Sequence, residues 1–195
     1  MNKVILWDLM DTVVKDPFFT RIAGFFGITF EELLRDKHPT LWSEFELGRI
    51  DESELSRRFF RDERPVDVPA LKSELRDAYT FVDGIQDLLV DLKTRNVDMH
   101  ALSNYPHWYT LIEDRLKLSR YMKLSFVSCR TGVRKPDPRA YLGPCEMLGR
   151  SPEQAIFVDD REVNVEAARQ QGLCGVHFSG DVNLLRKQLE ALLIR

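Results

Sequence analysis

Short apolar runs alternate with helical patterns along the second half of the chain, and this alternation most constrains the fold. The runs span 97–102, 124–128, 155–158 and 173–178. Each is a continuous apolar stretch, as in strands that helices cover on both faces of a parallel sheet. Segments with apolar residues at helical spacing lie between them. This order predicts an α/β fold, a doubly wound parallel sheet with right-handed crossovers.

An apolar run, residues 4–7, also opens the chain and stops at Asp8. We expect it to be a further strand of the same sheet. Residues 15–81 separate it from the others, and their apolar residues recur at helical spacing with no period of two. The sequence therefore predicts a sheet domain formed by 1–14 and 82–195, into which an all-helical segment is inserted.

Composition and charge narrow the class of protein. The formal net charge of −3 gives no basic field for nucleic acid or an anionic membrane. No apolar run approaches the length of a membrane span, and no basic leader precedes the N-terminal run. The three cysteines are an odd number at wide spacings, which indicates reduced thiols and disfavours a zinc site. We therefore expect a cytoplasmic protein, with an organelle reached by a transit peptide as the alternative.

Polar side chains follow three of the predicted strands: Asp8, Ser103, Asn104, Asp159 and Asp160. The carboxyl ends of parallel strands lie at one edge of a sheet, so these side chains are expected to converge. Three carboxylates repel one another unless a cation lies between them. Carboxylate oxygens with water suit the octahedral preference of Mg²⁺. The sequence therefore predicts a magnesium site at this edge.

Lys135 precedes a predicted helix and is expected at the same edge of the sheet. A lysine, a hydroxyl group, backbone N–H groups and Mg²⁺ together bind a phosphoryl group. Asp8 would then be a carboxylate able to accept that group as an aspartyl-phosphate. Either residue alone would be an ordinary strand-end or surface residue, so the hypothesis rests on the whole set.

The order of these motifs resembles the haloacid dehalogenase (HAD) superfamily. The matching segments are Asp8-x-x-x-Thr12, Ser103-Asn104, Lys135-Pro-Asp-Pro138 and Asp159-Asp160-x-x-x-Asn164. The resemblance implies a Rossmann-like core with a helical cap inserted at residues 15–81. It also implies a Mg²⁺-dependent phosphatase that acts on a small phosphomonoester through an aspartyl-phosphate.

The resemblance implies a set of metal ligands. Asp8 is expected to be both the nucleophile and a magnesium ligand. The backbone carbonyl of Met10 and the carboxylate of Asp160 are the further expected ligands. Asp159 is expected to act on the metal mostly through water.

The resemblance also implies how the phosphate is bound. Ser103 and the backbone N–H of Asn104 are expected to hold phosphate oxygens, with Thr12 supporting this phosphate-binding loop. Lys135 is expected to balance the charge of the phosphate and of the nucleophile. Asn164 is expected to orient the lysine.

One position departs from the pattern of the superfamily. Its phosphatases usually carry a second aspartate two residues after the nucleophile, which protonates the leaving alkoxide. Met10 occupies that position and has no proton to donate. Loss of a general acid costs about 10²–10⁴ in rate. We expect Asp11, or a water that it holds, to be the donor. Dehalogenation needs no metal, so the paired Asp159 and Asp160 disfavour it.

A narrower resemblance concerns the substrate. Several segments are similar to plant plastid FMN hydrolases, which convert FMN to riboflavin and phosphate. They are Asp16-Pro-Phe-Phe19, Lys37-His-Pro39, Glu44-Phe-Glu46, Asn104-Tyr-Pro106 and Arg134-Lys-Pro-Asp-Pro138. FMN is therefore the first candidate substrate. Phe18, Phe19, Tyr105 and Trp108 are expected to form a pocket for its isoalloxazine ring.

Two alternative functions stay open at this point. The same chemistry could serve a sugar-phosphate or nucleotide phosphatase with a different pocket. A non-catalytic regulatory relative is the alternative from another class, and it would explain the missing second aspartate. We expect a monomer or homodimer whose partner is a small phosphate ester, with the plastid stroma as the alternative location.

Overall fold

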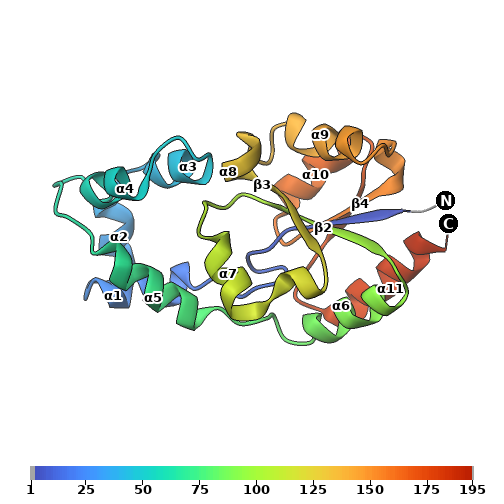
Figure 1. Cartoon of the computed structure of the whole chain (residues 1–195), viewed down its shortest axis with the longest axis horizontal. Coiled ribbons are helices and arrows are strands. Elements are labelled where there is room, and N and C mark those ends of the chain that lie inside the picture. The colour runs from blue at the N-terminus through green and yellow to red at the C-terminus, as the bar shows by residue number, and fades with distance from the viewer. Residues whose placement is uncertain (1–2, 195) are drawn as a thin grey trace.

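A five-stranded parallel sheet forms the centre of the protein. The computed structural model describes residues 3–194, except for the side chain of Phe19. The strands are β1 (Val4–Trp7), β2 (Asp98–Ser103), β3 (Lys123–Val127), β4 (Ala155–Asp159) and β5 (Cys174–His177). Their order in the sheet is β3-β2-β1-β4-β5 (Figure 1). The predicted α/β class is confirmed, and the N-terminal run is the central strand.

Helices cover both faces of this sheet (Figure 1). On one side lie α6 (Ile85–Thr94) and α11 (Val182–Leu193), and on the other α9 (Arg139–Met147) and α10 (Glu162–Gln170). The other elements that follow β2 are α7 (Tyr109–Leu116), η2 (Leu118–Arg120), α8 (Ser128–Thr131) and η3 (Pro152–Gln154).

Strand β1 shows why the apolar runs are continuous. Successive side chains of a strand point to opposite faces. Ile5 and Trp7 pack in the core cluster that contains leucines of α6 and α11, whereas Val4 and Leu6 pack in the cluster under α9 and α10. All four are fully buried. A strand buried on both faces needs apolar residues at every position, which is the pattern that the sequence has.

The segment between β1 and α6 is helical. It contains η1 (Phe18–Ile22), α1 (Ala23–Phe25), α2 (Phe30–Asp36), α3 (Leu41–Glu46), α4 (Glu52–Arg58) and α5 (Val68–Ala78). No strand occurs among the described residues of this segment, and its helices lie to one side of the sheet (Figure 1). Side-chain caps begin three of the helices, at Thr29, Asp51 and Asp67. These caps satisfy N–H groups that would otherwise lack partners.

The chain enters and leaves this helical segment through two connections that pair with each other. The N–H of Lys15 donates to the carbonyl of Thr80 at 2.9 Å, and the N–H of Val82 donates to the carbonyl of Val13 at 3.0 Å. The two connections, at 13–15 and 80–82, therefore lie side by side, and the helical segment is joined to the sheet domain at this one place.

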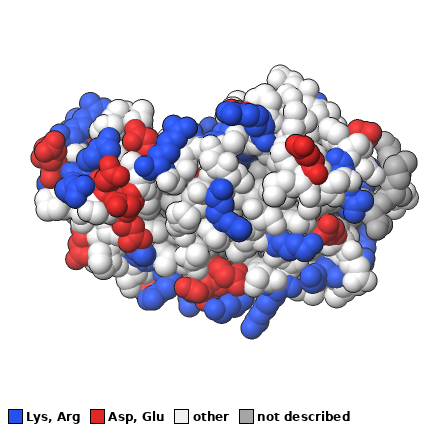
Figure 2. Space-filling view, turned by 45° about the horizontal axis from the view of Figure 1, so that its top comes forward, with Lys and Arg blue, Asp and Glu red and all other residues white. Residues whose placement is uncertain are grey.

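Charged side chains of both signs share the face of the molecule shown in Figure 2. Many form ion pairs between exposed neighbours, such as Arg58 with Glu54 and Arg76 with Asp77. Exposed pairs of this kind contribute little to stability, because water already solvates both charges. The fold therefore depends mainly on its two apolar clusters.

The turn after α3 packs closely against α8. The hydroxyl of Ser128 donates to the carbonyl of Glu46 at 2.5 Å and accepts from the N–H of Tyr105 at 3.0 Å. Gly48, with φ +67°, lies so near that an added Cβ would be 2.7 Å from the carbonyl oxygen of Cys129. This contact fixes α3 against the core.

Substitution of Gly48 tests this contact. Gly48→Ala should lower the free energy of unfolding by about 1–3 kcal/mol more than Gly27→Ala, because overpacking adds to the cost of a left-handed backbone. Gly27 has the same φ of +67°, but its added Cβ meets nothing within 4 Å. Urea denaturation of both variants gives the difference. Equal losses would show that the contact with Cys129 is not tight.

Candidate active site

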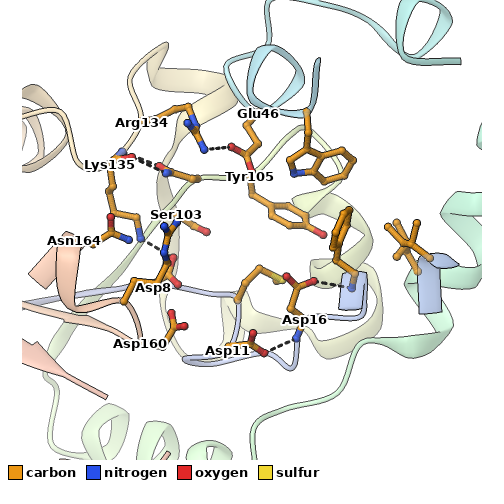
Figure 3. Close-up of a pocket in the computed structure, with 17 residues that line it drawn as sticks. Asp8, Asp11, Asp16, Glu46, Ser103, Tyr105, Arg134, Lys135, Asp160 and Asn164 are labelled. Atoms are coloured by element: carbon orange, nitrogen blue, oxygen red, sulfur yellow. Dashed lines mark hydrogen bonds and ion pairs between the residues drawn. The ribbon is translucent and has the colours of Figure 1, made fainter. Parts of the chain in front are cut away.

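A cavity of about 540 Å³ lies between the carboxyl edge of the sheet and the helical segment. Figure 3 shows the acidic residues Asp8 and Asp160 in one part of it, and Glu46, Arg134 and Tyr105 in another. The residues that line it are Asp8, Met10, Asp11, Asp16, Phe18, Ile22, Trp42, Glu46, Leu75, Ser103, Asn104, Tyr105, Arg134, Lys135, Asp160, Arg161 and Asn164.

Strand register brings the acidic residues together. Trp7 pairs with Val158 in the parallel ladder, so the next residues, Asp8 and Asp159, follow at the same level. Carboxylate oxygens of Asp8, Asp159 and Asp160 lie within 4.8 Å of one another. Their convergence agrees with the geometric prediction from the sequence.

Lys135 lies in the middle of this cluster and is almost fully buried. Its Nζ donates to Asp8 Oδ1 at 2.6 Å and to Asp159 Oδ2 at 2.7 Å. Three carboxylates and one ammonium leave a net charge of −2 when all are ionised. A divalent cation neutralises that charge, and hard oxygen ligands suit Mg²⁺. The donor set therefore fits a magnesium ion.

Asp159 differs from the other two acids in its surroundings. It is fully buried and does not line the cavity. Besides Lys135, its carboxylate accepts from Asn164 Nδ2 at 3.0 and 3.1 Å and from the N–H of Arg161 at 2.8 Å. Both oxygens are thus engaged: Oδ2 contacts the lysine, and the bonds to Oδ1 hold the carboxylate in place. Asn164 acts on Lys135 through this carboxylate.

Burial determines the electrostatics of the cluster. Loss of water raises the pKa of Asp8, Lys135 lowers it, and the charge of Asp159 raises it again. Burial alone would lower the pKa of Lys135, but its two carboxylate partners raise the pKa above its ordinary value. The lysine therefore stays charged in an environment that normally disfavours an ammonium ion.

The loop after β2 presents two further polar groups. Asn104 clamps the backbone of Lys135: its Nδ2 donates to the carbonyl at 2.9 Å, and its Oδ1 accepts from the N–H at 2.8 Å. Within the described residues, the buried hydroxyl of Ser103 has no hydrogen-bond partner, although it lines the cavity. A buried hydroxyl of this kind is suited to a ligand oxygen.

Thr12 lies behind the site. It is fully buried, does not line the cavity, and its hydroxyl accepts from the N–H of Asp160 at 3.0 Å. From this position Thr12 can support the loop, as expected, but its hydroxyl cannot contact a phosphate in the cavity. The hydroxyl is instead used to fix Asp160.

The aromatic residues expected in the pocket have different positions. Phe18 and Tyr105 line the cavity, while the side chain of Phe19 lies outside the described residues. Trp108 is 2% exposed and does not line it. Its Nε1 donates to Glu52 Oε1 at 2.7 Å, and its ring packs on Trp42, which does line the cavity. The expectation for Trp108 was wrong because the inserted helices cover its ring.

Among the lining residues that the sequence analysis did not assign to the site are Asp16, Glu46 and Arg134. Arg134 and Glu46 form an ion pair at 2.6 Å across the cavity wall, whereas in the sequence an arginine before the lysine motif resembles any surface charge. Asp16 lines the cavity beside the paired connections. Both acids lie within segments that resemble FMN hydrolases, which was the one signal in the sequence.

These features define a class of protein, an α/β enzyme with a carboxylate–lysine site at the edge of its sheet. The family model for haloacid dehalogenase-like hydrolases matches residues 3–172. The chain therefore belongs to that family of hydrolases.

No helix among residues 3–194 is long and apolar enough to cross a membrane.

Curated relatives include several phosphatases. Flavin mononucleotide hydrolase 1 of Arabidopsis thaliana, described as chloroplastic, is 46% identical over 189 residues, which cover 97% of this chain and 77% of that protein. Phosphoglycolate phosphatase 1 of Pseudomonas aeruginosa is 35% identical over 91 residues, which cover 46% of this chain and 34% of that protein.

Solved structures have the same fold. A HAD family enzyme of Bacteroides thetaiotaomicron, in complex with magnesium and inorganic phosphate, has a TM-score of 0.76 at 20% identity and covers 95% of this chain and 99% of its own. L-2-haloacid dehalogenase from Xanthobacter autotrophicus has a TM-score of 0.64 at 18% identity, with coverage of 98% and 83%. At these identities the likeness concerns the fold alone.

Removal of the lysine tests the charge balance of the site. Lys135→Met should lower the free energy of unfolding by about 3–5 kcal/mol without divalent cations, since a buried charge loses its partner. Adding Asp159→Asn should recover part of this loss, because one of the two unpaired carboxylates is then neutral. Urea denaturation measures both. The exposed Lys93→Met is the control, and a double variant no more stable than Lys135→Met would contradict the account.

Proposed function

We propose that the chain is a Mg²⁺-dependent phosphomonoester hydrolase whose substrate is FMN. The observation that carries the proposal is the convergence of Asp8, Asp160 and Lys135 in one part of a cavity that is also lined by aromatic rings. The identity of 46% to an FMN hydrolase over nearly the whole chain supports the choice of substrate.

Asp8, Asp160 and the backbone carbonyl of Met10 are the proposed magnesium ligands. All three residues line the cavity, whereas Asp159 is buried behind Lys135. We therefore assign Asp159 mainly to positioning the lysine. When bound, the ion neutralises the acids and orients phosphate oxygens.

The proposed reaction has two steps. A carboxylate oxygen of Asp8 attacks phosphorus, and the bond between phosphorus and the ester oxygen breaks. Lys135, the Ser103 hydroxyl and the Asn104 N–H hold the oxygens of the transferred group. Water then attacks the aspartyl-phosphate, which releases inorganic phosphate and restores Asp8.

The shape and lining of the cavity support a large aromatic leaving group. Its volume of about 540 Å³ is in the range of pockets that enclose ligands of this size. Phe18, Trp42 and Tyr105 offer ring surfaces, and Ile22 and Leu75 add apolar walls. A small sugar phosphate or phosphoglycolate would leave these apolar surfaces in contact with water. This favours a flavin over the smaller substrates.

We infer that residues 15–81 act as a cap over the site. The two paired connections at 13–15 and 80–82 are the proposed hinge, and closure would exclude water during phosphoryl transfer. The ion pair of Arg134 with Glu46 joins cap and core at the cavity wall.

The chloroplast description of the Arabidopsis relative supports the plastid stroma over the cytoplasm as the location. Monomer or homodimer stays a prediction.

A panel of phosphate esters tests the substrate. With Mg²⁺, kcat/KM for FMN should exceed that for glucose 6-phosphate and phosphoglycolate at least about 10-fold, because ring stacking of about 1–3 kcal/mol is available only to the flavin. EDTA and Asp8→Asn should each abolish hydrolysis. Equal rates on all esters would reject FMN while keeping the phosphatase. Full activity in Asp8→Asn would reject the mechanism.

Calorimetric titration with Mg²⁺ tests the ligand assignment. Asp160→Asn should weaken Mg²⁺ binding at least about 10-fold, since the variant loses one charged oxygen ligand. The exposed Asp87→Asn, on α6, should bind Mg²⁺ as the wild-type protein does. Unchanged binding in Asp160→Asn would mean that the ion lies elsewhere.

A further inference from the structure

An alkyl phosphate needs a proton on its leaving oxygen, because an alkoxide is a poor leaving group. Five carboxyl groups line the cavity: Asp8, Asp11, Asp16, Glu46 and Asp160. Asp8 and Asp160 belong to the carboxylate cluster, and Glu46 is paired with Arg134. Two candidates are left, Asp11 and Asp16.

Asp11 has a structural task in the loop after β1. It is exposed and adopts a left-handed backbone with φ +52°. Its Oδ1 accepts from the N–H of Asp16 at 2.9 Å. This bond holds the carboxyl group of Asp11 against the backbone of the loop that carries Asp16.

Asp16 has the geometry of a donor. Its Oδ1 accepts from the N–H of Phe18 at 2.9 Å, while Oδ2 forms no hydrogen bond within residues 3–194. The residue is only partly exposed. In the view of Figure 3, its carboxyl group lies to the right of Asp8 and Asp160 and below the ring of Tyr105. A flavin whose phosphate is at Asp8 would bring its ester oxygen towards this carboxyl group.

The surroundings of Asp16 favour its protonated form. Burial raises its pKa to about 6, the N–H of Phe18 lowers it, and the charges of Asp11 and Asp160 raise it again. The other titratable groups close enough to interact with it are the hydroxyls of Tyr79 and Tyr105, which share a hydrogen bond at 2.6 Å and stay neutral. None of these neighbours is a cation that would stabilise the carboxylate.

We propose that Asp16 is the proton donor to the leaving oxygen, an inference that rests on the proposed phosphatase function. The proton of Asp16 Oδ2 passes to the ester oxygen as its bond to phosphorus breaks, and the alcohol leaves neutral. The water that then attacks the aspartyl-phosphate transfers its proton to the departing phosphate. A proton from solvent restores the Asp16 carboxyl group after each turnover. Asp11 is then a positioning residue and not the proton donor that the sequence led us to expect.

Two leaving groups distinguish this role from a structural one. Asp16→Asn should lower kcat for FMN about 10²–10⁴-fold, the usual contribution of a general acid. The same variant should lower kcat for p-nitrophenyl phosphate less than about 10-fold, because p-nitrophenolate leaves without a proton. The kcat–pH profile of the wild-type protein for FMN should decline at alkaline pH, and the variant should lose this decline. Asp77→Asn, an exposed change on α5, should match the wild type on both esters.

Retained activity on p-nitrophenyl phosphate shows that the variant is folded, and Asp16→Glu should recover part of the FMN activity. Equal losses on both esters, or a loss confined to FMN in Asp11→Asn but not in Asp16→Asn, would overturn the proposal. If the wild-type protein cleaves another alkyl phosphate but not FMN, the substrate is wrong and the same test applies to that ester. If it cleaves no ester, the proposed function and this inference fail together.

Discussion

The rest of the site depends on the buried contact of Lys135 with Asp8 and Asp159. Lys135 comes from the loop between α8 and α9, Asp8 follows β1 and Asp159 ends β4, and all three are nearly or fully buried. Removing such charges from water costs several kcal/mol per ion, and only close pairing offsets it. Asn164 and Asn104 complete the arrangement, one holding Asp159 and the other the backbone of Lys135. The lysine is thereby fixed where a phosphoryl group would arrive.

The helical segment decides what else can enter the cavity. It contributes Phe18, Trp42 and Glu46 to the wall, and the contact of α3 with α8 holds Trp42 and Glu46 over the sheet edge. In the proposed function, the core supplies groups for phosphoryl transfer, and the insertion supplies the surface that meets the leaving group. This division explains how different members of one family can carry out the same reaction on different substrates. It also places Asp16 at the junction between the two parts.

The position of Met10 shows why a missing residue does not by itself indicate a missing function. A proton donor is defined by where its carboxyl group lies relative to the leaving oxygen, and more than one segment of the chain reaches that place. Asp11 was the natural hypothesis from the sequence because it is adjacent to Met10. In the folded chain its carboxylate holds the N–H of Asp16, and the later residue presents the unbonded oxygen.

The sequence by itself determined the sheet, its strands and the acids that follow them. Short, continuous apolar runs that alternate with helical patterns form strands that helices cover on both faces of a parallel sheet. Parallel strands bring their carboxyl ends to one edge of the sheet, so Asp8, Asp159 and Asp160 had to meet. Only the tertiary structure decided which aromatic ring faces the cavity, because Trp42 and Trp108 have similar helical patterns and differ only in what packs over them. The same holds for Asp16, Glu46 and Arg134, whose partners are distant in the chain or depend on how a loop folds. Local pattern fixes the elements, whereas burial and pairing between segments far apart in sequence fix the site.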